Sequence, residues 1–153
     1  MLKEGDIAPS FSLMGSDGKM HTSKEFFGRF LVLYFYPKDD TVGCTLEAKC
    51  FNARMGEIRL TNSQVVGVSA DDLESHGKFI AKYDLGFLLL SDPDMKTIKD
   101  YEAYGNKGIF GRGIIRKTFI IDRDGKILKI FPKVHPEGHD KEVLQFLRNK
   151  SPY

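Results

Sequence analysis

The run Arg29–Pro37, RFLVLYFYP, constrains the fold of this chain more than any other segment. It is a continuous stretch of apolar and aromatic residues that ends at a proline, which is typical of a strand buried on both faces rather than one. Strands of this kind occupy the centre of sheets in α/β proteins, where helices cover both sides. The run therefore predicts a central strand and an α/β fold.

Two shorter runs of the same kind follow, at Ser63–Ala70 and Gly86–Pro93. Segments of helical length precede them, at Val42–Leu60 and Asp72–Leu85, and the second has apolar residues at three- and four-residue spacing. The alternation of strand and helix predicts that these runs are parallel neighbours of the central strand.

Asp-Gly pairs indicate two hairpins. Asp124-Gly125 separates two strand-like halves of Arg116–Pro132, and Asp17-Gly18 lies in a smaller pattern near the amino terminus. Glu142–Leu147 predicts a final amphipathic helix. We therefore expect a central mixed β-sheet flanked by helices, with an N-terminal β-hairpin.

Composition sets the class of protein. The 153 residues include 41% hydrophobic residues, which is enough for one compact domain spanning residues 1–153. The 23 basic and 21 acidic residues are scattered, so no stripe of charge favours nucleic acid or an anionic membrane. Charged residues interrupt the first segment and no apolar run is long enough to cross a bilayer. We expect a cytoplasmic protein whose partners are small molecules or proteins.

Cys44 stands where α/β sheets bind ligands, beyond the carboxyl end of the central strand and at the start of a helix. Thr41 is a suitable N-cap residue, which makes Cys44 about the third helical residue. Unpaired backbone N–H groups and the helix dipole favour the thiolate there, and Gly43 permits close approach of other groups. The chain thus offers Cys44 as a nucleophile, with a buried inert thiol as the alternative.

Other residues near Cys44 allow two interpretations each. Cys50 lies roughly 10 Å further along an ideal helix, beyond the reach of a disulfide, so it is either a partner after local unwinding or a bystander facing the core. Arg116 opens the strand that can neighbour the central one; it either reaches Cys44 or is a solvated edge charge. Glu47 is either functional or a carboxylate in the first half of a helix.

The histidines offer a weak metal hypothesis. His135 and His139 have the H-x3-H spacing of some zinc sites, but Pro136 and Gly138 interrupt it. The five residues between the two cysteines also exceed the usual spacing of zinc ligands. His21 and His76 have no partners nearby in the sequence, and we expect both on the surface.

The segment Tyr36–Thr45, YPKDDTVGCT, carries Pro37, Thr41 and Cys44 in a P-x3-T-x2-C arrangement. It resembles the peroxiredoxins, in particular the bacterioferritin comigratory protein or PrxQ branch. The similarity extends along nearly the whole chain, through GDIAPSFSL, VVGVSADDLESHGKF, FLLLSDP, GIIRKTFIIDRDGKI and GHDKEVL. The resemblance implies a thioredoxin-like fold and reduction of hydrogen peroxide or alkyl hydroperoxides, without metal or organic cofactor.

The resemblance also implies a role for each residue of the motif. Cys44 attacks a peroxide oxygen and becomes a sulfenic acid, the first step of thiol oxidation. Thr41 orients the peroxide, and Arg116 stabilises both the thiolate and the transition state. Pro37 shields the pocket from water, and Glu47 orients Arg116.

The chain departs from the family pattern at two positions. Val42 replaces the usual proline, which loosens the first helical turn slightly. Resolving cysteines usually lie five positions after the first, at the place of Lys49 here, whereas Cys50 is one residue later. We still expect Cys50 to form an intrachain disulfide with Cys44, which thioredoxin or a similar dithiol then reduces, in a monomer or weak homodimer.

Two functions of other classes stay open at this point. One is a thiol redox sensor in which a partner protein detects oxidised Cys44 without efficient turnover. The other is a thioredoxin-like metal-binding protein that uses Cys44, Cys50 and His135.

Overall fold

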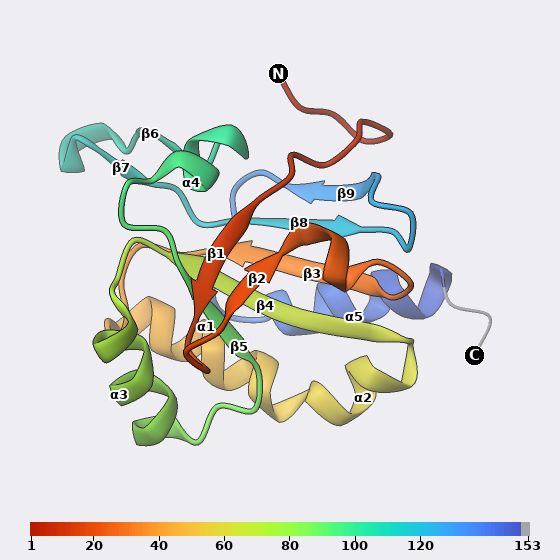
Figure 1. Ribbon diagram of the computed structural model, residues 1–153, viewed down its shortest axis with the longest axis horizontal. Coiled ribbons are helices and arrows are strands. Elements are labelled where there is room, and N and C mark those ends of the chain that lie inside the picture. Colours follow the sequence, from red (N-terminus) through yellow and green to blue (C-terminus); the bar gives the residue numbers. More distant parts are fainter. Residues whose placement is uncertain (151–153) are drawn as a thin grey trace.

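A seven-stranded mixed sheet forms the centre of the molecule (Figure 1). The computed structural model describes residues 1–150. In the sheet, the strand order is β2-β1-β5-β4-β3-β8-β9. The strands are β1 (Ser12–Gly15), β2 (Met20–Thr22), β3 (Phe30–Phe35), β4 (Ser63–Ser69), β5 (Leu88–Ser91), β8 (Lys117–Ile121) and β9 (Ile127–Phe131). β3, β4 and β5 are parallel, whereas β1, β8 and β9 each pair antiparallel with their neighbours. The prediction of a mixed sheet is confirmed.

All six residues of β3 are buried, as expected of a central strand. Because successive side chains of a strand point to opposite faces, β3 contributes to two hydrophobic layers. Val32, Tyr34 and the following Tyr36 belong to the layer that also holds Cys44. Leu33 and Phe35 belong to the layer on the other face. The alternation along this strand therefore decides which residues lie on the side of Cys44.

Helices cover the sheet, and in Figure 1 α1, α2 and α3 lie below it while α4 lies above. The helices are α1 (Val42–Ala53), α2 (Met55–Leu60), α3 (Leu73–Tyr83), α4 (Lys96–Asp100) and α5 (His139–Lys150), with short 3-10 turns η1 (Ser23–Phe26) and η2 (Gly108–Phe110). The expected helices at 72–85 and 142–147 are confirmed as α3 and α5. Both Asp-Gly hairpins are confirmed as β1–β2 and β8–β9.

The single helix expected over Val42–Leu60 is wrong, because the helix is interrupted at Arg54. The backbone of Arg54 has φ −101° and ψ 2°, outside the helical range. Its side chain donates to Asp140 at 3.2 Å and to Glu57 at 3.0 Å. The interruption therefore coincides with contacts to α5 and to the next helix. The local sequence pattern does not predict these contacts.

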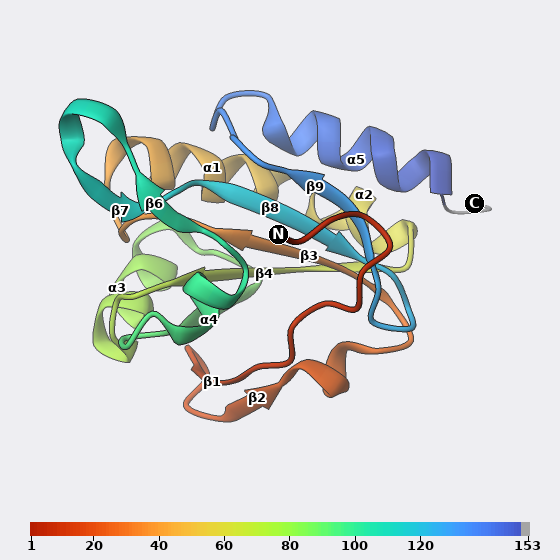
Figure 2. The same ribbon diagram turned by 90° about the horizontal axis from the view of Figure 1, so that it is seen from above.

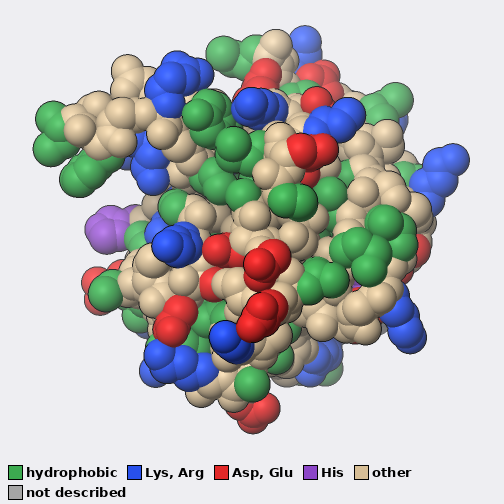
Figure 3. All heavy atoms as spheres, turned by 60° about the vertical axis from the view of Figure 1, so that its left-hand side comes forward, with side chains coloured by type: hydrophobic (Ala, Val, Ile, Leu, Met, Phe, Trp, Pro, Cys, Tyr) green, Lys and Arg blue, Asp and Glu red, His purple; other side chains and the backbone are tan. Residues whose placement is uncertain are grey.

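A third hairpin, β6 (Tyr104–Asn106) and β7 (Arg112–Ile114), was not predicted. Seen from above, it stands clear of the sheet at the same end of the molecule as the start of α1 (Figure 2). Its tip carries hydrophobic side chains (Figure 3), and Ile109 and Phe110 are 96% and 80% exposed. The chain passes from this hairpin through two residues directly into β8. Among residues 1–150, no helix has both the length and the apolar character needed to cross a membrane.

Candidate active site

Cys44 lies at the start of α1, just beyond the carboxyl end of β3. Thr41 is the N-cap residue, with extended backbone angles of φ −89° and ψ 161°, and α1 begins at Val42. Cys44 is thus the third helical residue, as predicted. Its backbone N–H belongs to the first turn, where these groups have no partner inside the helix. The side chain is 1% exposed, in the layer beneath β3.

Arg116 supplies the cationic partner of Cys44. Its Nη2 donates to Cys44 Sγ at 3.3 Å, and its Nη1 donates to Glu47 Oε1 at 2.8 Å. The register of the sheet explains this meeting, because β3 and β8 pair antiparallel with Phe35 opposite Lys117. The start of β8 therefore lies beside the end of β3, and Arg116 precedes β8 by one residue. The structure contradicts the alternative interpretation, in which Arg116 is a solvated charge at the edge of the sheet.

Gly43 leaves the space that Arg116 occupies. A Cβ atom at position 43 would lie 3.0 Å from Arg116 Nη2 and 3.5 Å from Pro136 Cγ. Contacts of 3.0 Å are tighter than carbon atoms in proteins normally allow. The close approach expected at Gly43 is therefore real, and the group that approaches is the guanidinium.

Glu47 lies one helical turn after Cys44 and is 1% exposed. Burial raises the pKa of the Glu47 carboxyl to about 7, although Arg116 acts in the opposite direction through its charge and its hydrogen bond. Glu47 binds Nη1 of Arg116, while Cys44 binds Nη2 of the same guanidinium. Cys44, Glu47 and Arg116 therefore form one connected group of side chains.

Thr41 and Pro37 lie in the loop between β3 and α1. Thr41 Oγ1 donates to the backbone carbonyl of Lys38 at 2.8 Å instead of capping α1. Thr41 is exposed and Pro37 is half-buried, and Thr41 precedes Cys44 by three residues. This geometry is compatible with the roles that the family resemblance implies, and the roles themselves are taken up below.

Cys50 lies on the same helix but in different surroundings. Both cysteines are free thiols, and Cys50 is half-buried. Burial raises the pKa of the Cys50 thiol, and the nearby carboxylates of Asp140 and Glu137 add to the effect. These groups belong to α5 and the segment before it. The neutral thiol is therefore favoured at Cys50.

Two histidines have positions that the sequence did not predict. His76 is 0% exposed, so the expected surface position is wrong; its partners, Asp39 and the carbonyl of Leu90, come from distant parts of the chain. A usable signal existed, because His76 precedes Phe79 and Tyr83 by three and seven residues, on the apolar stripe of α3.

His139 does not fit the metal hypothesis. It is 1% exposed, and its two ring nitrogens lie 2.8 Å from Thr118 Oγ1 and 2.7 Å from Glu142 Oε1, so both are already bonded to protein groups. The guanidinium of Arg116 beside Cys44 also opposes a metal cation there. The alternative of a metal-binding protein is therefore not favoured.

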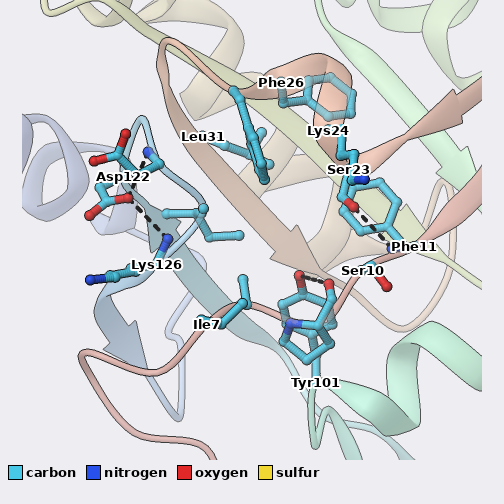
Figure 4. Close-up of a pocket in the computed structure, with 16 residues that line it drawn as sticks. Ile7, Ser10, Phe11, Ser23, Lys24, Phe26, Leu31, Tyr101, Asp122 and Lys126 are labelled. Carbon is cyan, nitrogen blue, oxygen red and sulfur yellow. Dashed lines mark hydrogen bonds between the residues drawn. The ribbon is translucent and has the colours of Figure 1, made fainter.

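An apolar cavity of about 330 Å³ lies on the other face of the sheet (Figure 4). Phe11, Leu31 and Tyr101 line it, and they belong to the hydrophobic layer that excludes Cys44. Tyr101 closes one side by donating its hydroxyl to the carbonyl of Pro9 at 2.6 Å. The cavity is separate from the cysteine site.

The sequence is similar to known proteins along nearly its whole length. The sequence matches the AhpC/TSA family over residues 5–130. The chain belongs to this family. A putative peroxiredoxin Bcp of Helicobacter pylori is 46% identical over 149 residues, covering 95% of this chain and 98% of the relative. Peroxiredoxin Bcp of Bacillus subtilis is 39% identical over 150 residues, which is 96% of each chain.

Solved structures of PrxQ proteins share the fold of this peroxiredoxin. A cysteine-to-serine mutant of Xylella fastidiosa PrxQ superposes with a TM-score of 0.93 at 33% identity, covering 98% of both chains. The bacterioferritin comigratory protein of Xanthomonas campestris, described for its alkyl peroxide reduction activity, gives 0.88 at 35% identity over 92% of this chain and 91% of that one. The thioredoxin-like fold and the activity of a thiol-dependent peroxidase are thereby confirmed.

Proposed function

We propose that this peroxiredoxin reduces hydrogen peroxide and alkyl hydroperoxides with Cys44 as the attacking thiolate. The observation that carries the proposal is the hydrogen bond from Arg116 to Cys44 Sγ at 3.3 Å, at the first turn of α1. The thiolate is the nucleophilic form of a cysteine, and a cation that donates to the sulfur stabilises this form. No other cysteine of residues 1–150 has such partners.

The first step is an in-line displacement on the peroxide. The Cys44 sulfur bonds to one peroxide oxygen, the O–O bond breaks, and the electron pair leaves with the second oxygen, which takes up a proton to give water or an alcohol. Sulfur is oxidised to a sulfenic acid and the peroxide is reduced. Negative charge develops on the leaving oxygen, so donors that are already in place lower the barrier.

The neighbouring residues have distinct proposed roles. Arg116 stabilises the thiolate and the developing charge, and Glu47 holds the guanidinium in that orientation through the 2.8 Å contact. Thr41 presents its hydroxyl to the peroxide from the N-cap position. Pro37 keeps water from the thiol. A small substrate is consistent with a sulfur that is almost completely buried.

Cys50 is the proposed resolving thiol. It attacks the sulfenic sulfur of Cys44, forming a disulfide and releasing water, and an external dithiol such as thioredoxin then reduces the disulfide. The two cysteines are six positions apart, which on an ideal helix separates their Cα atoms by roughly 10 Å, so the first turns of α1 have to unwind before the bond can form. The raised pKa of Cys50 makes its attack slow.

Substrate range and compartment follow from the same chemistry. The alkyl peroxide reduction described for the Xanthomonas campestris protein supports alkyl hydroperoxides as substrates beside hydrogen peroxide. A disulfide that forms in every cycle needs a supply of dithiol, which fits a cytoplasmic location. We propose a monomer or weak homodimer as the working form.

Consumption of peroxide by chelator-treated protein with dithiothreitol tests the function. The parent should turn over hydrogen peroxide and cumene hydroperoxide many times, and Cys44→Ser should turn over neither, because an alcohol is hardly ionised near neutral pH. Activity that persists in Cys44→Ser would refute the assignment. Consumption of one equivalent without turnover would identify a redox sensor instead.

Mass spectrometry after one equivalent of peroxide tests the resolving step. A Cys44–Cys50 disulfide lowers the mass by about two units and removes both free thiols. A free Cys50 beside a sulfenic or sulfinic Cys44, or a bridge between two chains, would show that Cys50 is a bystander. The enzyme would then depend on an external thiol for resolution.

A further inference from the structure

A buried pair of titratable side chains lies beside the loop that leads into α1. His76 of α3 is 0% exposed, and Asp39 of the loop is 7% exposed. Nδ1 of His76 lies 2.7 Å from Asp39 Oδ2, while Nε2 lies 2.9 Å from the carbonyl oxygen of Leu90. Because a carbonyl only accepts hydrogen bonds, Nε2 carries a proton. One further proton is held between Nδ1 and Asp39, so the pair as a whole is neutral.

Asp39 is bound from three further directions. Its Oδ1 accepts from the hydroxyl of Tyr36 at 2.5 Å, and its Oδ2 accepts from Ser75 Oγ at 2.8 Å. Its backbone N–H donates to Asp71 Oδ2 at 2.8 Å. Asp71 in turn accepts from Ser69 Oγ at 2.6 Å. The end of β3, the end of β4 and the first turn of α3 therefore all bind one residue of the loop.

The neighbours of Asp39 in the loop are fixed as a consequence. Lys38, on one side, provides the carbonyl that accepts from Thr41 Oγ1 at 2.8 Å. Asp40, on the other side, has a left-handed backbone with φ 58°, and its carboxylate accepts from Lys82 Nζ at 2.9 Å and Tyr83 Oη at 2.8 Å. Both of these partners also belong to α3 or its last turn. The place of Thr41 is therefore set from α3.

Stability alone is a weak reason for burying such a pair. Removing charged groups from water costs about as much as their attraction returns, and apolar replacements of buried pairs are often neutral or stabilising. A network in which each member is bonded does, however, fix a single geometry. Here that geometry is the loop of residues 37–41, which borders the thiol of Cys44.

We propose that the His76–Asp39 pair is a positioning unit for peroxide reduction: by fixing the loop against α3, it holds Thr41 where its hydroxyl aligns the peroxide with Cys44. The pair touches none of the reacting atoms. This inference rests on the proposed roles of Cys44 and Thr41, and it adds the part of the molecule that keeps them in register.

Stopped-flow oxidation of Cys44 tests the proposal. Asp39→Asn keeps the shape of the side chain but removes its charge, and a shift of the loop of about 1 Å should slow oxidation about tenfold to a hundredfold. Ser75→Ala removes one of the bonds to Asp39 and should slow it about threefold. Alkylation of Cys44 by iodoacetamide, which requires the thiol but no alignment of a peroxide, should stay within about twofold of the parent.

A double-mutant cycle shows whether the effect passes through Thr41. Thr41→Val removes the hydroxyl, so adding Asp39→Asn to it should cause little further loss. Ser63→Ala is the matched control, because it removes a buried hydroxyl pair with Thr61 at 2.8 Å at the opposite end of β4. It should lower the midpoint of thermal unfolding and leave Cys44 oxidation unchanged.

Several results would overturn the proposal. This inference alone would be overturned if Cys44 were oxidised at the parent's rate in Asp39→Asn and Ser75→Ala but slowly in Thr41→Val. It would also be overturned if the losses from Asp39→Asn and Thr41→Val multiplied in the double mutant, or if Ser63→Ala lost as much rate as Asp39→Asn. Thr41→Val at the parent's rate would overturn both this inference and the role proposed for Thr41. Should Asp39→Asn fail to fold, the rates of Cys44 oxidation in Ser75→Ala and Tyr36→Phe decide the outcome.

Discussion

Cys44 and Cys50 belong to one helix, yet their surroundings have opposite character. Cys44 is in the first turn, almost completely buried, and accepts a hydrogen bond from the guanidinium of Arg116. Cys50 is in the second half of α1, half-buried, and faces the carboxylates of Asp140 and Glu137. Cys44 thus has a cation as the partner of its sulfur, whereas burial and two carboxylates raise the pKa of Cys50.

The residue type alone therefore does not determine the chemistry of a cysteine. A thiol early in a helix has unpaired N–H groups beside it, whereas a thiol two turns later has none. The neighbouring elements then add a cation in one case and carboxylates in the other. The proposed attacking and resolving cysteines thus differ in the charge of their neighbours, and substitutions of either set of neighbours test this difference.

Removing the cation from Cys44 should have the largest effect. Arg116→Ala is expected to slow oxidation of Cys44 about a hundredfold, because one well-placed donor is worth about that much to a developing oxyanion. Arg116→Lys should recover only part of the rate, since an ammonium lacks the planar fork that serves Cys44 and Glu47 together. The measurement is stopped-flow oxidation of Cys44.

Arg112→Ala is the matched control for that prediction. Arg112 is an exposed cation of β7, four residues before Arg116, and packs on the ring of Tyr104. Cys44 of the Arg112→Ala variant should be oxidised at the parent's rate. Equal rates in Arg116→Ala and the parent would contradict the distinction between the two cysteines.

The pH dependence of stability tests the surroundings of Cys44 through Glu47. Its pKa is about 7 in the folded protein against 4.5 when unfolded, so the folded state binds more protons between these values. The contribution of Glu47 to stability is therefore present at low pH and is lost as pH rises through this window. From about pH 4.5 to pH 8, the parent should lose about 2 to 4 kcal/mol relative to Glu47→Gln.

Urea unfolding of both proteins at several pH values measures that difference. Gln keeps the size of the side chain and cannot ionise, so the other titrating groups cancel in the comparison. A stability difference that is independent of pH would show that Glu47 is ionised throughout, and the group formed with Arg116 would then be a permanent ion pair.

The smallest effect is expected on the side of Cys50. Asp140→Asn removes one carboxylate that disfavours the Cys50 thiolate, so alkylation of Cys50 by iodoacetamide in the Cys44→Ser background should become about twofold to threefold faster. Glu57→Gln is the control, because Glu57 binds the same Arg54 without facing Cys50. An unchanged rate in Asp140→Asn would leave burial as the cause of the raised pKa.

The sequence predicted the parts of the fold that follow from local patterns. The buried run around Val32, the helical spacing in α3 and the two Asp-Gly turns each depend on residues close together in the chain. The break at Arg54 does not, since arginine is a good helix former and its partner Asp140 is 86 residues away. The hairpin β6–β7 was missed because each strand has three residues and no alternation.

The site was predictable to a similar extent. The place of Cys44 followed from strand and helix patterns. Arg116 was a candidate from its place at the start of a strand, but its approach to Cys44 depends on the register of β3 with β8. The pair of His76 and Asp39 was not foreseen, because 37 positions separate them and neither is unusual for its segment. Contacts of this kind are decided by tertiary structure, beyond what spacing along one element can indicate.

Gly43 also bears on any attempt to build this site into another protein. A designer who copies a cysteine, a threonine and an arginine onto a helix start would normally fill the position before the cysteine with a good helix former such as alanine. The Cβ of that alanine would stand 3.0 Å from the guanidinium and push it away from the sulfur. The transplant would have every reactive group, but its guanidinium would have to shift by a few tenths of an ångström relative to the sulfur, so the missing Cβ of Gly43 is part of the site's design.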